Sequence, residues 1–132
     1  MRSIHAIVSG LLLLSSGSAW ADWTPVGGDG DIYAAFADTG SIHAHGPNVT
    51  MSGMYDFVKR DFTPEGKGLY STVVLREYDC TGKRVRLLSA IDFSGHMGGG
   101  EAVSTSAYTG RWEPVIEGAL DEAYWKVACA GK

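Results

Sequence analysis

The chain has 132 residues, of which 45% are hydrophobic and 20% charged, and its formal net charge at pH 7 is −4. An acidic chain lacks the positive surface on which general nucleic-acid binding depends, so nucleic acid is not an expected partner. The part that follows the signal described below is long enough to bury one hydrophobic core, which predicts a single domain.

The N-terminus has the composition of a secretory signal. Arg2 provides a positive charge, residues 7–14 form an apolar run, and residues 19–21 (Ala-Trp-Ala) are a small-x-small cleavage sequence. The apolar run is shorter than the roughly 20 residues that span a bilayer, so a retained membrane span is not expected. We therefore predict a signal peptide at residues 1–21 and one exported domain at residues 22–132, in the periplasm or at the cell surface.

The N-terminal half of this domain shows the period-two alternation of apolar residues that is typical of β-strands. Thr39-Gly40 and Gly46-Pro47 are turn sequences that separate the strands. Within the longest strand, Gly53 indicates a bulge or a point where another part of the chain comes close. The predicted segments are an edge-pairing segment at residues 22–31, strands at 31–38, 41–45 and 49–59, and a loop at 60–68.

A β-hairpin over residues 69–97 forms the centre of the predicted sheet. Residues 79–83 supply its turn, in which Gly82 is able to take a positive φ. A flexible glycine-rich loop follows at residues 95–100, and a further strand at residues 101–108. The alternation predicts that one face of the return strand carries Val85, Leu87, Ser89, Ile91 and Phe93.

One helix is predicted, at residues 118–129. Apolar residues recur along it at intervals of three and four from Leu120 to Ala128, and this stripe would pack on a face of the sheet. The only two cysteines are Cys80, at the mouth of the hairpin turn, and Cys129, at the end of the helix. An exported chain in an oxidising compartment is expected to join them in a structural disulfide. The predicted fold class is therefore α+β, an antiparallel sheet with one C-terminal helix packed on a sheet face and tethered by the disulfide.

Two segments have features of anion-binding sites. The run at residues 83–86 is basic, and we interpret it as a solvated turn flanked by charges, because most charge runs need no partner. The glycines at residues 98–100 could cradle an anion, but a phosphate loop also needs a preceding strand, a following helix and usually a lysine. We interpret them as a flexible connection.

Asp38-Thr39-Gly40-Ser41 has the sequence of an aspartic-protease active site. That chemistry needs two carboxylates that share a proton on a rigid loop with an apolar support. No such supporting segment follows in the sequence, and Asp-Thr-Gly is also ordinary turn chemistry, which is the interpretation we favour. Neither catalysis nor a cofactor is predicted.

His43 and His45 alternate along a strand and therefore point to one face, a spacing that can hold zinc or copper. A metal site needs a third and usually a fourth ligand, and the sequence does not show that Asp92, His96 or Met97 converges on the pair. We therefore favour two exposed strand histidines, and the pair remains only a candidate for a metal site.

Short motifs follow one another along the whole exported domain. In chain order they are Trp23, Tyr33–Ile42, Val49–Val58, Tyr78–Cys80, Arg84–Leu88, Phe93-Ser94 with Met97, Gly98 and Gly100, Trp112 with Pro114, and Trp125–Cys129. In this order, and with these two cysteine positions, the chain resembles the surface-adhesin protein E family of exported bacterial proteins. The resemblance implies an antiparallel sheet of about six strands and a non-enzymatic adhesin that binds host extracellular-matrix proteins. It also suggests a homodimer.

Three classes of function remain open on the sequence. The first is an exported, non-enzymatic binding protein of the adhesin E type that recognises a protein partner. The second is a soluble periplasmic module that binds a small ligand or an envelope protein. The third is an enzyme or metal-binding protein built on Asp38 or on the pair of His43 and His45.

Overall fold

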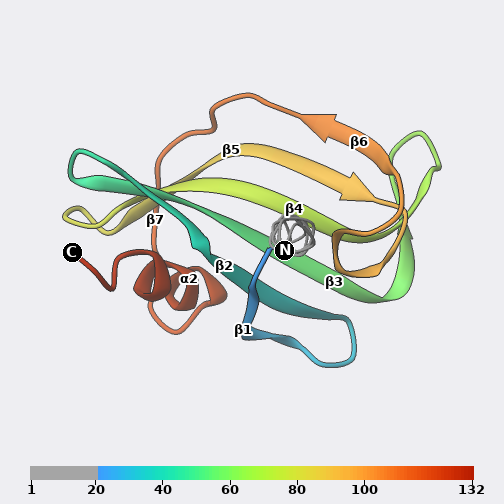
Figure 1. The fold of residues 1–132 in the computed structure, drawn as a ribbon, viewed down its shortest axis with the longest axis horizontal. Helices are drawn as coiled ribbons and strands as arrows, with labels where there is room; N and C mark the ends of the chain where they lie inside the picture. Colours follow the sequence, from blue (N-terminus) through green and yellow to red (C-terminus); the bar gives the residue numbers. More distant parts are fainter. Residues whose placement is uncertain (1–20) are drawn as a thin grey trace, which may run out of the picture.

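A computed structural model describes residues 21–132, so the predicted signal lies outside the described residues except for Ala21. The strands pair antiparallel in chain order from β1 to β6, and β7 pairs with β5 (Figure 1). This confirms the predicted antiparallel sheet with a C-terminal helix, and no helix in the described part is long and apolar enough to cross a bilayer. The elements are β1 (Trp23–Asp29), β2 (Tyr33–His45), β3 (Asn48–Phe62), β4 (Gly68–Asp79), β5 (Arg84–Phe93), η2 (His96–Gly98), β6 (Ala102–Ser106), β7 (Glu113–Pro114) and α2 (Leu120–Ala128).

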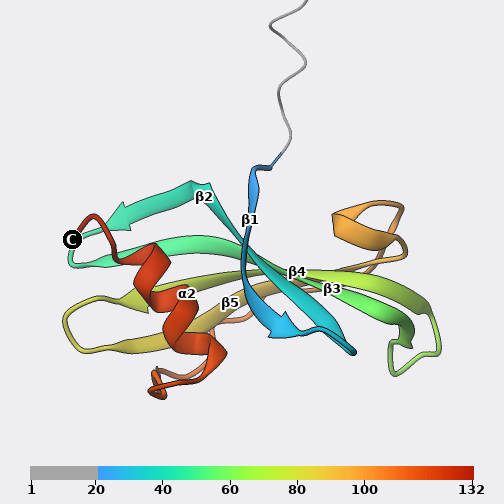
Figure 2. The same ribbon diagram turned by 90° about the horizontal axis from the view of Figure 1, so that it is seen from below.

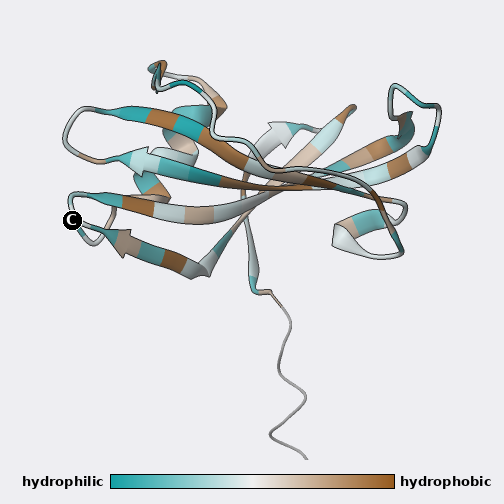
Figure 3. Cartoon of the chain, turned by 90° about the horizontal axis from the view of Figure 1, so that it is seen from above, coloured by the Kyte–Doolittle hydropathy of each residue, from teal (hydrophilic) through white to brown (hydrophobic). Residues whose placement is uncertain are grey.

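The helix α2 covers the half of the sheet that carries the β4–β5 turn (Figure 2). The short helix η2 is bonded to Asp56 and Ser71, towards the other end of β3 and β4. Hydrophobic and hydrophilic residues alternate along the long strands, as the period-two pattern requires (Figure 3). The apolar residues at the contact between α2 and the sheet form one buried cluster. Its members are Ala35, Ala37, Val49, Met51, Tyr78, Val85, Val115, Tyr124 and Ala128.

The strand β2 is continuous where the sequence predicted a turn at Thr39-Gly40. The register of β2 against β3 shifts between Asp38 and His43, so the extra residues form a bulge and the strand continues in the same sheet. The Asp38 carboxylate accepts a hydrogen bond from the Gly40 N–H (3.0 Å). The Ser41 hydroxyl donates to the Asp38 carbonyl (2.6 Å) and accepts from the Ser52 N–H (2.8 Å). The predicted turn was wrong because these side chains satisfy the backbone groups that a bulge leaves unpaired.

A second bulge changes the faces of β5. Leu75 pairs with Ser89, but the next residue, Arg76, pairs with Leu87, so Leu88 is an extra residue on β5. Val85 and Leu87 therefore face the helix side, while the later odd-numbered residues face the opposite side. The prediction that all five residues share one face was wrong, because a single inserted residue reverses the alternation beyond it. The residues on the opposite side are Ser89, Ile91 and Phe93.

The β4–β5 turn differs from its prediction at one residue. The positive φ belongs to Lys83 (55°), not to Gly82. Gly82 is needed for a different reason, since a Cβ at this position would overlap the Asp79 carboxylate. The glycine lets the backbone approach the side chain that closes the turn.

The glycine-rich segment after β5 is hydrogen-bonded to the sheet face opposite α2, so its prediction as a flexible connection was wrong. The fully buried Ser71 hydroxyl donates to the Gly95 carbonyl (2.6 Å) and accepts from the Gly98 N–H (2.8 Å). The Asp56 carboxylate accepts from the Met97 N–H (2.8 Å) and lies 3.1 Å from His96 Nδ1. Polar side chains of β3 and β4 thus hold in place a loop that its composition alone predicted to be flexible.

Tyr124 packs α2 directly on the backbone of β3. A Cβ built at Gly53 would lie 2.9 Å from Tyr124 Cε1. The Tyr124 hydroxyl donates to the Phe36 carbonyl (2.9 Å), with the Met54 carbonyl as a longer second acceptor (3.3 Å). Burial raises the pKa of Tyr124 above its ordinary value, so the hydroxyl keeps its proton and remains a donor. The structure thus makes Gly53 a point of close approach.

The disulfide joins Cys80, next to the end of β4, to Cys129, next to the end of α2, across 49 residues of sequence. The two Cα atoms are 5.7 Å apart. The predicted tether between the helix and the sheet is confirmed.

We expect Cys129→Ala to lower the melting temperature by about 8–20 °C. Removing a native disulfide from a small exported domain typically costs about 2–5 kcal/mol, and about 1 kcal/mol moves the midpoint of a domain this size by roughly 4 °C. Thermal unfolding followed by circular dichroism measures the change, with reduced wild-type protein as the matched control. An unchanged melting temperature would show that the tether does not contribute to stability.

We expect Gly53→Ala to lower the free energy of unfolding by about 1–3 kcal/mol, because the added methyl group would push against the Tyr124 ring. Urea unfolding measures this change. Gly131→Ala is the control, since nothing lies within 4 Å of its Cβ position. Equal stability of the two variants would contradict the packing described for Tyr124.

Candidate functional site

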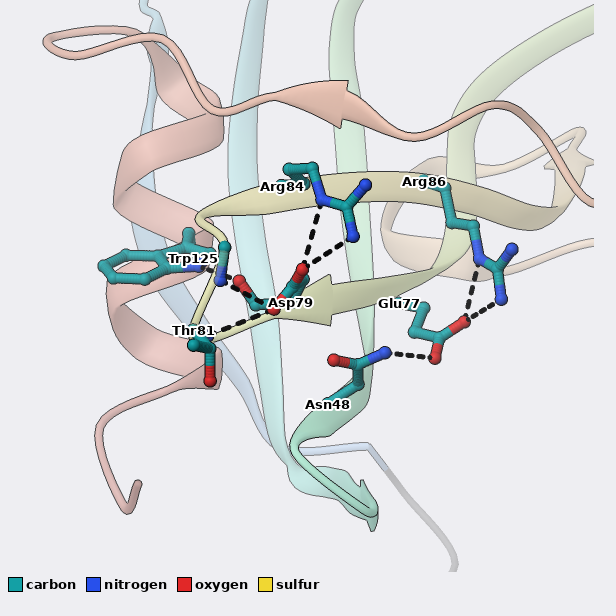
Figure 4. A network of polar contacts seen from close by, with 8 residues as sticks. Asn48, Glu77, Asp79, Thr81, Arg84, Arg86 and Trp125 are labelled. Atoms are coloured by element: carbon teal, nitrogen blue, oxygen red, sulfur yellow. Dashed lines mark hydrogen bonds and ion pairs between the residues drawn. The ribbon is translucent and has the colours of Figure 1, made fainter.

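The end of the sheet where β4 turns into β5 carries a network of polar side chains (Figure 4). Asp79 organises the turn. Its Oδ1 accepts hydrogen bonds from the N–H groups of Thr81 (3.1 Å) and Gly82 (2.8 Å), and its Oδ2 accepts from Arg84 Nε (3.1 Å) and Nη2 (2.9 Å). The Gly82 N–H and the Arg84 guanidinium hold the pKa of Asp79 below its ordinary value. The carboxylate is therefore charged and its acceptor sites are occupied.

Glu77 organises the second half of this network. Its Oε1 accepts from Arg86 Nε (2.9 Å) and Nη2 (2.7 Å), and its Oε2 accepts from Asn48 Nδ2 (3.0 Å). Burial alone would raise the pKa of Glu77, but the hydrogen bonds from Asn48 and Arg86 outweigh it and the pKa is lowered. Each of the two arginines is thus held by its own carboxylate, and the two pairs lie two residues apart along β4 and β5.

Trp112 lies against both of these arginines. The guanidinium carbon of Arg84 is 4.9 Å from the centroid of the Trp112 ring, and that of Arg86 is 4.4 Å from it. The arginine side chains remain 48% and 29% exposed. We name Arg84, Arg86 and Trp112 the arginine–tryptophan surface. It presents an aromatic ring and two oriented guanidinium groups to solvent.

The helix holds this surface in place from the other side. The Trp125 indole N–H donates to the Asp79 carbonyl (3.0 Å), as Figure 4 shows. Lys83 Nζ lies 2.9 Å from Glu122 Oε2 and 5.2 Å from the centroid of the Trp125 ring. The turn is therefore bonded to both the sheet and the helix, which makes the arginine–tryptophan surface a rigid one.

The two candidate metal ligands lie on the outer part of β2. His43 pairs with Thr50 and His45 with Asn48, and the two imidazole rings are 5.1 Å apart. Within residues 21–132 no group of three or more His, Cys, Asp or Glu residues is placed to hold a metal ion. His96, which the sequence offered as a third ligand, bonds to Asp56. The pair of His43 and His45 therefore remains a predicted metal site, for which the described part of the chain brings together only two ligands.

Sequence reasoning did not single out the arginine–tryptophan surface. The signal was present in part, because Arg84 and Arg86 are two residues apart on a strand and must share a face. Their interpretation as a solvated turn left out the aromatic residue. Trp112 follows Arg86 by 26 positions in the chain. Only the pairing of β7 with β5 brings it beside the arginines.

Comparison with known proteins gives one family and one fold. The sequence model of the surface-adhesin protein E family matches residues 23–130. The selenomethionine form of Haemophilus influenzae protein E aligns with a TM-score of 0.61 and 14% identity, covering 74% of this chain and 79% of that one. Protein E from non-typeable Haemophilus influenzae aligns with a TM-score of 0.63 and 12% identity, covering 86% and 79%. At these identities the solved structures show a shared fold. No curated protein sequence matches significantly.

We expect the free energy of unfolding to fall as the pH is lowered below about 4.5. Asp79 and Glu77 have a lowered pKa in the folded protein, so in acid the unfolded chain binds more protons. Their stabilisation is complete above the ordinary pKa values of about 3.9 and 4.3, and is lost as the pH falls through the lowered ones. Urea unfolding between pH 3 and pH 7 measures the slope.

Asp79→Asn should flatten part of this slope and lower the stability at pH 7 by about 1–2 kcal/mol, because it removes a charge-assisted hydrogen bond. Glu65→Gln is the control, since Glu65 is exposed in the loop before β4 and forms no ion pair in the described part of the chain. Identical pH profiles for the two variants would contradict the role given to Asp79.

Proposed function

This chain belongs to the surface-adhesin protein E family, and from that membership we propose that it is an exported, non-enzymatic protein that binds a protein partner through its arginine–tryptophan surface. The family description makes it an adhesin-like binding protein. The partner we propose is a host extracellular-matrix protein. The proposed chain consists of a signal peptide at residues 1–21 and one binding domain at residues 22–132.

The observation that carries the proposal is the contact of Trp112 with Arg84 and Arg86. Tryptophan and arginine are the residues most enriched at the energetic centres of protein interfaces. The carboxylates of Asp79 and Glu77 already hold both guanidinium groups in position, so binding would cost little side-chain entropy. Preorganised groups of this kind are what a binding surface requires.

The remaining hydrogen-bond donors indicate how a partner would be recognised. Both Arg84 and Arg86 use Nε and Nη2 for their carboxylate partners, which leaves Nη1 of each without a hydrogen bond in the described part of the chain. Because their charges are already paired, net charge attraction is not the main source of affinity. We propose that the partner places a carbonyl or carboxylate at the two Nη1 groups and packs on the face of Trp112.

A periplasmic role is the alternative that the family membership leaves open. In that case the same surface would bind an envelope protein, or the domain would bind a small ligand, without contact with a host. A homodimer is compatible with either role and is proposed on the resemblance to the family. Cellular location separates the two roles.

The first experiment is digestion of intact cells by an added protease, with a tag on the protein and a known periplasmic protein as control. We expect the tagged protein to be digested while the control is protected, because a host-binding adhesin must be displayed on the outer surface. Protection of both would contradict host binding and would make an envelope protein the partner to isolate.

The second experiment measures the affinity of the purified protein for immobilised matrix proteins. We expect Trp112→Ala to weaken binding by about 30-fold or more, as loss of an interface centre does. Phe62→Ala is the matched control, because Phe62 is an exposed aromatic residue under the guanidinium of Arg60 (5.4 Å) in another part of the sheet. Arg86→Lys should also weaken binding while keeping the charge. Equal affinity of all variants, with unchanged melting temperatures, would exclude this surface.

A further inference from the structure

Arg76, on β4, points to the helix side of the sheet and lies beneath α2. Arg84 and Arg86 point to the other side. Arg76 pairs across the sheet with Met51 and Leu87, which lie on the helix side. Its guanidinium carbon lies 5.7 Å from the centroid of the Tyr55 ring and 5.8 Å from that of Tyr124. Two aromatic rings therefore flank the Arg76 guanidinium on the side of the sheet that carries the buried core.

This cation forms no ion pair in the described part of the chain, although the charge of Asp121 acts on it from beyond ion-pair distance. No carboxylate there lies within ion-pair distance of Arg76, and its buried Nη1 has no hydrogen-bond acceptor. Burial raises the pKa of Tyr78 to about 12, so that neighbour remains a neutral phenol at physiological pH. Burial alone would lower the pKa of Arg76, but the nearby Tyr55, Tyr78 and Asp121 outweigh it and the pKa is raised. The guanidinium stays charged.

An unpaired charge beneath a helix is expensive, and a methionine or leucine would pack there at lower cost. The two arginines of the opposite face differ in this respect, since each has a carboxylate partner within hydrogen-bond distance. Stability therefore does not account for an arginine at this position. A group that enters from solvent would supply the missing charge.

Such a group can reach Arg76 through a recess beside the helix. The recess has a volume of about 610 Å³, within the range of small-ligand sites. One wall is the connection from β6 to β7, which runs along the outer edge of β5 (Figure 1) and is held there by the hydrogen bond from the Gly110 N–H to the Leu87 carbonyl (2.8 Å). Residues that line it besides Arg76 include Val85, Leu87, Arg111, Glu113 and Asp121.

The charged and the aliphatic residues that line the recess indicate which class of ligand it would bind. Arg76 and Arg111 are opposed there by Glu113 and Asp121, while Arg86, which also borders it, is already paired with Glu77. A dianionic phosphate would be repelled by the two carboxylates, whereas a single negative charge would be tolerated. Val85 and Leu87 provide an aliphatic wall for a carbon chain. An arginine fork also matches the planar geometry of a carboxylate.

We propose that this recess binds the carboxylate of a small organic acid, with the carboxylate at Arg76 and the carbon chain against Val85 and Leu87. The carboxylate position at Arg76 lies on the opposite face of the sheet from the paired arginines, and of the arginine–tryptophan surface only Arg86 borders the recess. The site does not depend on the protein partner proposed above. Its ligand is a solute of the compartment into which the chain is exported.

The test is a titration of the ¹⁵N-labelled protein by NMR at constant ionic strength, with sodium acetate, sodium butyrate and inorganic phosphate as separate probes. We expect both carboxylates to give saturable shifts of the Arg76 side-chain N–H and of the backbone at Leu87 and Gly110. Butyrate should bind several-fold more tightly than acetate, because its chain reaches the aliphatic wall. Absence of saturable shifts with both carboxylates, or tighter binding of phosphate, would overturn the proposal.

Variants separate the site from general salt effects. Arg76→Gln should weaken butyrate binding at least 10-fold, and Asp121→Asn should tighten it several-fold by removing an opposing charge. Arg60→Gln, which changes an exposed arginine elsewhere in the sheet, is the control and should bind as the wild type does. If Arg76→Gln fails to fold, the comparison of butyrate affinity between the wild type and Asp121→Asn still tests the proposal. Equal butyrate affinity of wild type and Asp121→Asn would then count against the recess.

Discussion

The attachment of α2 to the β4–β5 turn is the constraint on which the rest of the structure depends. A helix of nine residues is too short to be stable alone, so tertiary contacts must hold it. The disulfide from Cys80 fixes its end, and the Trp125 indole donates to the carbonyl of Asp79. Between these points the Tyr124 ring reaches the backbone of Gly53. The helix thereby covers the apolar face that β2, β3 and β4 present.

Asp79 connects this attachment to the outer surface. Its carbonyl bonds the helix, while its carboxylate shapes the turn and orients Arg84. One residue thus transmits the position of the helix to the face that carries Trp112. On that face the arginines are paired and their charges are neutralised, whereas Arg76 on the helix face is not. The neighbouring strands β4 and β5 therefore use arginine in two ways: β5 carries arginines as preorganised contacts, and β4 carries one as an unpaired charge that a ligand can satisfy.

The sheet shows where alternation along a strand is a reliable guide and where it is not. The strands and the helix occur close to their predicted positions, because period-two and helical patterns are local properties of the sequence. The bulges at Thr39-Gly40 and at Leu88 were not predictable in this way. Each depends on how one strand meets its neighbour, and one extra residue exchanges the faces of all residues beyond it.

The sequence by itself determined the fold class, the disulfide between Cys80 and Cys129, and the resemblance to the surface-adhesin protein E family. These follow from local periodicity, from having only two cysteines, and from the order of motifs along the chain. Both candidate sites were decided by the tertiary structure alone. Trp112 meets Arg84 and Arg86 only because β7 returns to β5, and the environment of Arg76 exists only once α2 is docked. The physical reason is that pairing, burial and missing counter-charges depend on distances between residues far apart in the chain, which no local pattern encodes.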